Sequence, residues 1–217
     1  ATALPTIVGD LGGLNLLSWV ITAYLLAVTT ATPLFGKLGD LYGRKTVFQG
    51  AIVLYTLGSV ACGVSGDMAQ LIASRVVQGV GAGGLIVVAQ AIIADVVSPR
   101  ERGRYQGLFG AVFGLASVAG PLAGGYLTDH LSWRWIFFVK VPFAVLALIV
   151  TSATLPANIR RANARIDWLG ICLLSISIVS FVLLTTWGGQ DYAWTSAVIL
   201  GLAALAVVAG ALFVRTQ

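Results

Sequence analysis

Gly36-Lys37-Leu38-Gly39-Asp40-Leu41-Tyr42-Gly43-Arg44-Lys45, residues 36–45, is a polar segment between two long apolar stretches. Residues 11–36 carry no charge before it, and residues 46–66 carry none after it. At a rise of about 1.5 Å per residue, each stretch can cross a hydrocarbon core of about 30 Å as a helix. The decapeptide is therefore predicted to be a polar turn between two membrane-spanning helices.

The composition indicates a protein of the lipid bilayer. Charged residues make up 10% and hydrophobic residues 58% of the 217 residues, and the mean hydropathy is +0.94. A soluble domain carries about a quarter charged residues, so this chain has too little polar surface to cover a water-soluble globule. The apolar stretches are continuous rather than alternating, which favours helices over a transmembrane barrel. We predict an all-α, polytopic transmembrane helical bundle.

Charge-free windows predict eight helices, of which the first is incomplete. The first ends near Val8, and the others cover residues 16–35, 46–65, 69–94, 105–127, 135–155, 168–187 and 194–214. Tryptophans lie near the ends of these spans, as in an interfacial aromatic belt: Trp19, Trp133, Trp135, Trp168, Trp187 and Trp194. Because the pattern begins and ends within helices, we interpret the chain as a piece of a longer protein.

Basic residues fall on alternate connections between the predicted helices. One set of connections contains Lys37, Arg44, Lys45, Arg100, Arg102, Arg104, Arg160, Arg161, Arg165 and Arg215. The other set contains Asp10, Asp67, Asp129 and Asp191, with Arg134 nearby. Because positively charged loops stay in the cytoplasm, we predict a multi-pass protein of the cell membrane with cytoplasmic loops at 36–45, 96–104 and 156–167. The net charge of +5 is dispersed over these loops, which argues against nucleic acid as a partner.

The sequence lacks the residue patterns of an enzyme or a metal site. Cys62 and Cys172 lie in different apolar stretches without metal-ligand spacing, and His130 is the only histidine. A G-x-G-x-x-G match at Gly79, Gly81 and Gly84 lies inside an apolar stretch, whereas a dinucleotide site needs it between a strand and a helix. We predict no enzymatic activity, no cofactor and no bound metal.

The decapeptide resembles the cytoplasmic signature between helices two and three of the major facilitator superfamily. Matching residues are Gly36, Asp40, Gly43, Arg44 and Lys45, whereas Leu41 stands where the family usually has Arg. The resemblance implies that this turn gates transport, holding one face of the transporter against its other half. In similar transporters an acid at the end of helix four joins this cluster, so we predict an Arg44–Asp95 pair, which the helix macrodipole also favours. The alternatives are a merely solvated loop and a solvated Asp95.

Residues 71–84, LIASRVVQGVGAGG, resemble the fourth-helix signature of drug:proton antiporters. The resemblance implies that Arg75 and Gln78 take part in proton coupling, with the arginine tuning the protonation of a nearby membrane carboxylate. In the family that acid usually lies on the first helix, about two turns before Ala3-Leu4-Pro5, a position that precedes Ala1. The alternatives for Arg75 are a structural salt bridge and snorkelling to the membrane surface.

Residues 107–125 resemble the fifth-helix signature of the family's exporters, G-x8-G-x3-G-P-x-x-G-G. Matching residues are Gly107, Gly120, Pro121, Gly124 and Gly125, and Ala116 replaces a usual glycine. The resemblance implies a transporter that exchanges its substrate for protons. Pro121 is expected to kink the helix, and the glycines to leave a groove for a neighbouring helix. The alternative is an ordinary kinked packing helix.

Residues 133–138 and Pro142 resemble the start of helix six in the fourteen-helix drug:proton antiporters. Lys140 stands where those proteins usually have Asn, and its role is left open between snorkelling and a part in substrate binding or coupling. The short connection at 156–167 and the two spans after it fit the fourteen-helix plan. We therefore predict a six-helix major facilitator half-bundle at 1–156, and a loop with two inserted, lipid-side helices at 157–217.

Together these resemblances imply a proton-coupled multidrug efflux transporter that exports amphipathic or cationic compounds. Protons are the expected coupling ion, and the expected partners are the bilayer, a small amphipathic substrate and a missing C-terminal half. Substrate would bind between the two halves, because alternating access needs both. One alternative is a dedicated exporter of a metabolite, lipid or amino acid. Another is a membrane scaffold or sensor that transports nothing.

Overall fold

The structure, a computed structural model, describes residues 3–155 and 167–216. Within these ranges the chain forms helices, with only an isolated bridge between Gly188 and Tyr192. The helices are α1 (Leu4–Leu11), the 3₁₀ helix η1 (Leu14–Leu16), α2 (Leu17–Tyr42), α3 (Arg44–Gly63), α4 (Met68–Val96), α5 (Arg102–His130), α6 (Trp135–Phe138), α7 (Lys140–Thr154), α8 (Trp168–Trp187) and α9 (Ala197–Thr216). Seven helical segments in the described ranges are long and apolar enough to cross a membrane. The predicted all-α membrane bundle is confirmed.

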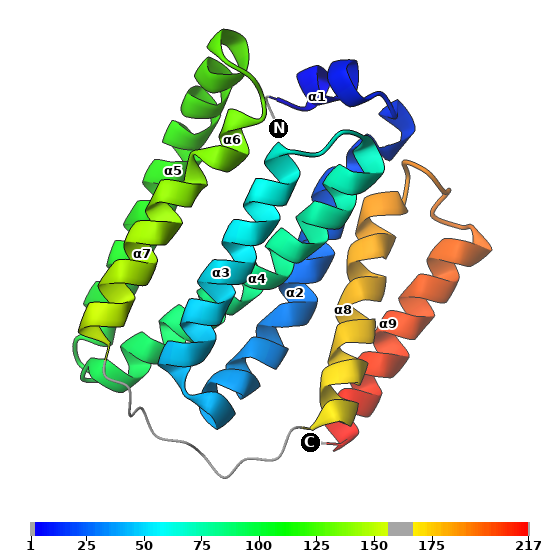
Figure 1. The fold of residues 1–217 in the computed structure, drawn as a ribbon. Helices are drawn as coiled ribbons and strands as arrows, with labels where there is room; N and C mark the ends of the chain where they lie inside the picture. Colours follow the sequence, from blue (N-terminus) through cyan, green and yellow to red (C-terminus); the bar gives the residue numbers. More distant parts are fainter. Residues whose placement is uncertain (1–2, 156–166, 217) are drawn as a thin grey trace.

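The helices run side by side in three groups (Figure 1). Helix α4 packs along both α2 and α3 at the centre, α7 packs on α3, and the α8–α9 hairpin packs on α2. The bundle therefore has two ends, which we name by residues that lie there. At the Gly43 end α2 meets α3 and α4 approaches α5, whereas the Asp10 end carries α1 and α6.

The decapeptide at 36–45 is not the ten-residue turn that the sequence predicted. Helix α2 continues to Tyr42 and α3 begins at Arg44, so Gly43 alone separates them. Gly43 has φ +93°, a region that only glycine enters readily. Polar residues can extend a helix beyond the apolar stretch, because the backbone of a helix satisfies its own hydrogen bonds on both sides of the membrane boundary.

The other predicted spans agree with the structure to within a few residues at most ends. The predicted 168–187 helix coincides with α8, and the predicted 135–155 helix is divided at Val139 into α6 and α7. The first helix continues past its predicted end at Val8 to Leu11, where Gly12 with φ +67° ends it. The predicted cytoplasmic loop at 156–167, with Arg160, Arg161 and Arg165, falls outside the described residues except for Asp167.

The glycines of α4 allow close contact with α2 and α3. A Cβ atom built on Gly79 would lie 2.6 Å from the carbonyl oxygen of Tyr24, and one on Gly83 would lie 2.5 Å from that of Val28. A Cβ on Gly81 would collide with the backbone of Tyr55 on α3. The G-x-G-x-x-G match therefore lies in the middle of a helix and serves helix packing, as small residues do in membranes.

Helix α5 is the least covered of the long helices. None of its described side chains is buried, and a Cβ on Gly107, Gly120 or Gly125 would meet open space. The fifth-helix glycines were expected to leave a groove for a neighbouring helix, and no described helix fills that space. Pro121 lies inside α5, which continues through it without interruption.

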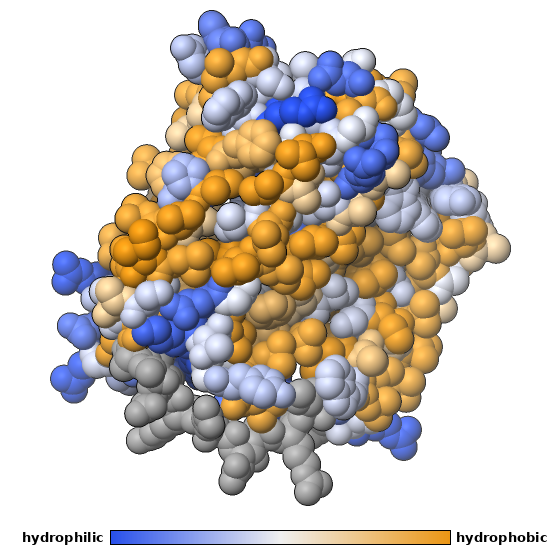
Figure 2. All heavy atoms as spheres, in the orientation of Figure 1, coloured by the Kyte–Doolittle hydropathy of each residue, from blue (hydrophilic) through white to orange (hydrophobic). Residues whose placement is uncertain are grey.

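Polar side chains gather toward the two ends of the bundle, and apolar ones lie between them (Figure 2). Figure 2 shows hydrophobic side chains across the middle of the visible face and hydrophilic ones toward its upper and lower parts. Trp133 departs from the predicted aromatic belt, because it is only 1% exposed. It packs in the core with Ile7, Met68 and Leu71, so its ring faces protein and not the membrane interface.

Candidate functional site

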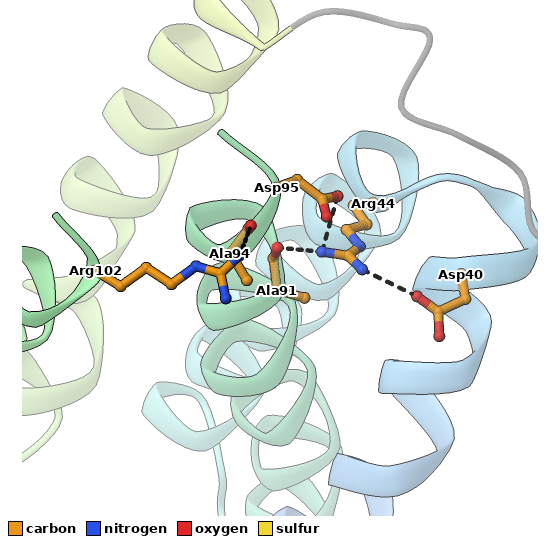
Figure 3. Close-up of polar contacts among 6 residues, drawn as sticks. All are labelled: Asp40, Arg44, Ala91, Ala94, Asp95 and Arg102. Atoms are coloured by element: carbon orange, nitrogen blue, oxygen red, sulfur yellow. Dashed lines mark hydrogen bonds and ion pairs between the residues drawn. The ribbon is translucent and has the colours of Figure 1, made fainter. Parts of the chain in front are cut away.

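Arg44 is the centre of a charged cluster at the Gly43 end. Its Nη1 lies 2.8 Å from Asp95 Oδ2 on α4, and its Nη2 lies 3.3 Å from Asp40 Oδ1 on α2. Nη1 also donates a hydrogen bond to the carbonyl oxygen of Ala91 (Figure 3). The guanidinium thus joins three helices, and the predicted Arg44–Asp95 pair is present in the structure.

The geometry of this cluster follows from the turn at Gly43 and the end of α4. Gly43 reverses the chain within one residue, so that Arg44 begins α3 beside the carbonyl end of α4. That end carries the negative pole of the helix macrodipole, which attracts cations. Arg102 donates from Nη2 to the carbonyl oxygen of Ala94 at 2.6 Å, so a second arginine reaches the same helix end (Figure 3).

Lys45 turns away from this cluster and ties α3 to α7. Its Nζ donates to the carbonyl oxygens of Ser152 at 2.8 Å and Leu155 at 2.6 Å. Gln49, one turn further along α3, donates to the hydroxyl of Ser152 at 2.9 Å. Sequence reasoning assigned Lys45 to the gating turn but missed its attachment to the end of α7. The sequence carried no signal for this contact, because it depends on α3 and α7 being neighbours.

Gly36 belongs to the signature but not to the charged cluster. A Cβ atom there would lie 3.5 Å from Val87 Cγ2, which is ordinary van der Waals contact. Gly36 therefore makes no tight helix contact, whereas the glycines of α4 do. Of the residues predicted to gate, the structure brings together Asp40, Arg44 and Asp95.

Arg75 lies inside the span of α4 and is held by neutral groups. Its Nε donates to the carbonyl oxygen of Val20 at 3.1 Å, and its Nη1 to Gln78 Oε1 at 2.6 Å. Its guanidinium carbon lies 3.9 Å from the ring centroid of Tyr24. Gln78, which is 0% exposed, donates in turn to Ser59 Oγ at 2.6 Å. Arg75 and Gln78 therefore form one network, and among the described residues no carboxylate pairs with Arg75.

A cavity of about 350 Å³ brings the separate membrane motifs together, and we call it the Arg75 cavity. It is lined by Ala3, Leu4, Ile7, Val20, Ile21, Arg75, Gly120, Pro121, Gly124, Ile136, Phe137 and Lys140. The fourth-helix arginine, the centre of the fifth-helix signature and Lys140 thus face one space. Gln78 does not line the cavity but accepts a hydrogen bond from Arg75, which does. Gly107 and Gly125 do not line the cavity.

A second polar cluster, which sequence reasoning missed, lies at the Asp10 end. Trp133 donates from Nε1 to Asp10 Oδ2 at 2.9 Å, and Arg134 Nη1 lies 3.6 Å from the same oxygen. Arg134 also donates to the carbonyl oxygen of Ser65 at 2.9 Å. The isolated basic residue among acidic connections was the signal for this pair. The cluster joins α1 to the start of α6.

Comparison of the sequence with known proteins identifies relatives of this chain. The family model of the Major Facilitator Superfamily matches residues 1–216. The chain is 49% identical over 98% of its length to an MFS-type transporter of Mycobacterium tuberculosis, of which it covers 31%. It is 42% identical over 95% of its length to a multidrug transporter protein of Bacillus subtilis, and it covers 38% of that protein. It is 38% identical over 94% of its length to an efflux pump of Gibberella moniliformis, and it covers 38% of that protein as well. The chain thus spans about a third of the length of these relatives.

Proposed function

We propose that this chain, which belongs to the Major Facilitator Superfamily, is one half-bundle of an exporter that exchanges amphipathic small molecules for protons. The observation that carries the proposal is the Arg75 cavity, where the resemblances to antiporter helices four and five meet. The Bacillus relative is named a multidrug transporter and the Gibberella relative an efflux pump, and both names point in the same direction.

In this proposal the Arg75 cavity is one wall of the substrate site. Its lining is mostly apolar, which suits an amphipathic molecule, and hydrogen bonds to Val20 and Gln78 fix the guanidinium of Arg75 in it. The opposite wall belongs to a second half-bundle, the partner that transport by alternating access requires. The uncovered face of α5, which contributes Gly120 and Pro121 to the lining, is where we place that partner.

The Arg44 cluster is the proposed gate of this half-bundle. The pair between Arg44 and Asp95 and the longer contact with Asp40 hold the ends of α2, α3 and α4 together. Both carboxylates are partly exposed, so each contact is worth on the order of 1 kcal/mol and can break in every cycle. We place this end in the cytoplasm, because it carries most of the basic residues in the connections, and the protein in the cell membrane.

Proton coupling is assigned to the network of Arg75 and Gln78. The first turn of α1 lines the same cavity through Leu4 and Ile7, so an acid upstream of α1, where the family resemblance places one, would approach Arg75 from this side. A carboxylic acid there would lie near a cation, and it would take up and release its proton as the cation's surroundings change. Gln78 accepts a hydrogen bond from Arg75 and donates one to Ser59. These bonds hold the guanidinium in one place, so its influence on the pKa of the acid depends on how close the acid lies.

The test is a transport assay on the full-length protein that contains this chain. Purified protein is reconstituted into liposomes with a pH-sensitive dye inside, and proton movement is recorded when an amphipathic compound is added. A panel of cationic ethidium, neutral N-phenyl-1-naphthylamine and anionic 8-anilino-1-naphthalenesulfonate covers the possible charges.

An antiporter moves protons opposite to at least one of these compounds, and empty liposomes move none. A dedicated exporter would respond to its own metabolite, lipid or amino acid and to no member of the panel. A scaffold or sensor would give no proton movement with any compound, and that outcome would contradict the proposal.

A further inference from the structure

The Arg75 cavity contains two cations and no acid among its described lining residues. Arg75 enters it from α4, and Lys140 from the first residue of α7. The remaining lining is apolar or small. A positive charge in apolar surroundings is costly unless an anion or water compensates it, and charged residues within membrane spans usually mark a functional pathway.

Arg75 has hydrogen-bonding capacity left over. A guanidinium has five N–H donors. Nε and Nη1 donate to Val20 and Gln78, and within the described ranges Nη2 has no hydrogen-bond acceptor. The stacking on Tyr24 and the hydrogen bonds of Nε and Nη1 keep the group in place. A fixed guanidinium with a free edge is suited to bind an oxyanion.

Lys140 has fewer polar partners than Arg75. Its ammonium makes neither a hydrogen bond nor an ion pair with any residue in 3–155 or 167–216. Its nearest aromatic neighbours are Phe137, with the ring centroid 5.3 Å from Nζ, and Tyr55, at 6.0 Å. Aromatic faces attract a cation only weakly, so they hold the ammonium at the cavity without neutralising it.

The acids at the two ends of α4 and on α1 are engaged elsewhere. Asp67 caps the start of α4 by accepting from the backbone N–H of Gln70. Asp95 pairs with Arg44 at the Gly43 end, and Asp10 accepts from Trp133 and pairs with Arg134 at the opposite end. None of these carboxylates lines the Arg75 cavity. Within the described chain, the two cations of the cavity therefore have no anionic partner.

We propose that Arg75 and Lys140 form a subsite for the anionic group of an amphipathic substrate, a carboxylate, sulfonate or phosphate. The substrate's apolar body lies against Ile7, Ile21 and Phe137 of the same cavity. This inference rests on the proposed export function and narrows its substrate class. While the acid proposed upstream of α1 is protonated, it does not neutralise Arg75, and the positive charges of Arg75 and Lys140 then repel a cationic compound. If Lys140 only extends to the membrane surface, replacing it does not change the preference of the cavity for anionic over neutral compounds.

The experiment compares two probes that share one aromatic body. 8-Anilino-1-naphthalenesulfonate carries a sulfonate, and N-phenyl-1-naphthylamine is its neutral parent. Binding of each is titrated by fluorescence to the full-length protein in nanodiscs of phosphatidylcholine. Because hydrogen bonds to charged groups are the stronger ones, Lys140→Met is expected to weaken binding of the sulfonate about tenfold and to change binding of the neutral parent less than about twofold.

Two control variants make the result specific. Lys140→Arg keeps the charge and should retain the preference for the sulfonate. Lys37→Met makes the same substitution on α2 outside the Arg75 cavity, and should leave both affinities unchanged. Monodisperse elution of each variant in size-exclusion chromatography shows that it is folded.

If Lys140→Met weakens the binding of both probes equally, or weakens the binding of neither, the proposed subsite is overturned. A phosphatidylglycerol-containing nanodisc that abolishes sulfonate binding would assign the two cations to a membrane lipid and would also overturn the substrate assignment. The outcome is separable from that of the transport assay. Charge-selective binding without proton movement contradicts the exporter alone, whereas proton-coupled transport without charge selectivity contradicts the subsite alone.

Discussion

Arg44 Nη1 lies 2.8 Å from Asp95 Oδ2, so an ion pair joins the first residue of α3 to the last turn of α4. The side chain of Arg44 is 20% exposed and that of Asp95 is 35% exposed. At this exposure water screens the pair, and its strength is modest. A contact of this kind can hold two helices in one arrangement and still be released without a large barrier, which is what a gate requires.

Neutralising the acids around Arg44 should slow transport in a graded way. Asp40→Asn is expected to reduce the initial rate of efflux while leaving expression and folding largely intact. Asp95→Asn should reduce it further, because Asp95 lies closer to the guanidinium than Asp40, whose Oδ1 is 3.3 Å away and whose side chain is 42% exposed. Rates are measured on the full-length protein in liposomes, with Asp129→Asn as a control that touches neither residue. Unchanged efflux in both variants would count against a gating role.

The Arg44–Asp95 pair was predictable because its two requirements are visible in the sequence. A carboxylate at the end of an apolar helix opposes the helix macrodipole, and a signature arginine on the same side of the membrane can offset it. The span boundaries were predictable for a similar reason, since the absence of charge over about 20 residues is imposed by the bilayer.

Other features depend on which helices become neighbours, and a single sequence carries little information on that. Trp133 was assigned to an aromatic belt, but it is buried and donates to Asp10, because α1 crosses that end of the bundle. The attachment of Lys45 to the end of α7 could not be predicted without knowing that α3 and α7 are adjacent. The meeting of Lys140 with Arg75 in one cavity has the same origin.

Arg75 should influence the pH dependence of coupled transport. Arg75→Ala removes a positive charge next to the cavity, and the loss of a nearby cation favours the protonated form of a carboxylic acid. If an acid of the first helix couples to this arginine, the pH profile of efflux by the full-length protein is expected to move to higher pH. Arg75→Lys keeps the charge and should move the profile less. An identical profile in Arg75→Ala would leave the residue with a structural role.

The glycines of α4 should be intolerant of even one added carbon. Gly79→Ala places a Cβ 2.6 Å from the carbonyl oxygen of Tyr24, so α2 and α4 must separate, at a cost of roughly 1–3 kcal/mol in the free energy of unfolding. Gly50→Ala is the matched control, because its Cβ would meet open space in the second turn of α3. The better helix propensity of alanine should then leave stability unchanged or raise it by up to about 1 kcal/mol. Thermal unfolding of the two purified variants decides the matter, and equal melting temperatures would contradict close packing at Gly79.

The side of the membrane on which the Gly43 end lies is tested by labelling single cysteines. Tyr42 is 63% exposed at the end of α2, and a Cβ atom built on Gly103 in the first turn of α5 would meet open space, so a cysteine at either position is accessible to reagents. Cys62 and Cys172 are first replaced by alanine, because Cys172 is exposed and would react.

If this end is cytoplasmic, a charged maleimide that cannot enter intact cells labels neither Tyr42→Cys nor Gly103→Cys, and it labels both once the membrane is permeabilised. Asp191→Cys, between α8 and α9 at the opposite end, should be labelled in intact cells and serves as the positive control. Labelling of position 42 or 103 in intact cells would invert the topology. The Arg44 cluster would then face the outside, the positive-inside distribution of the connections would have misled the assignment, and the proposed direction of export would lose its basis.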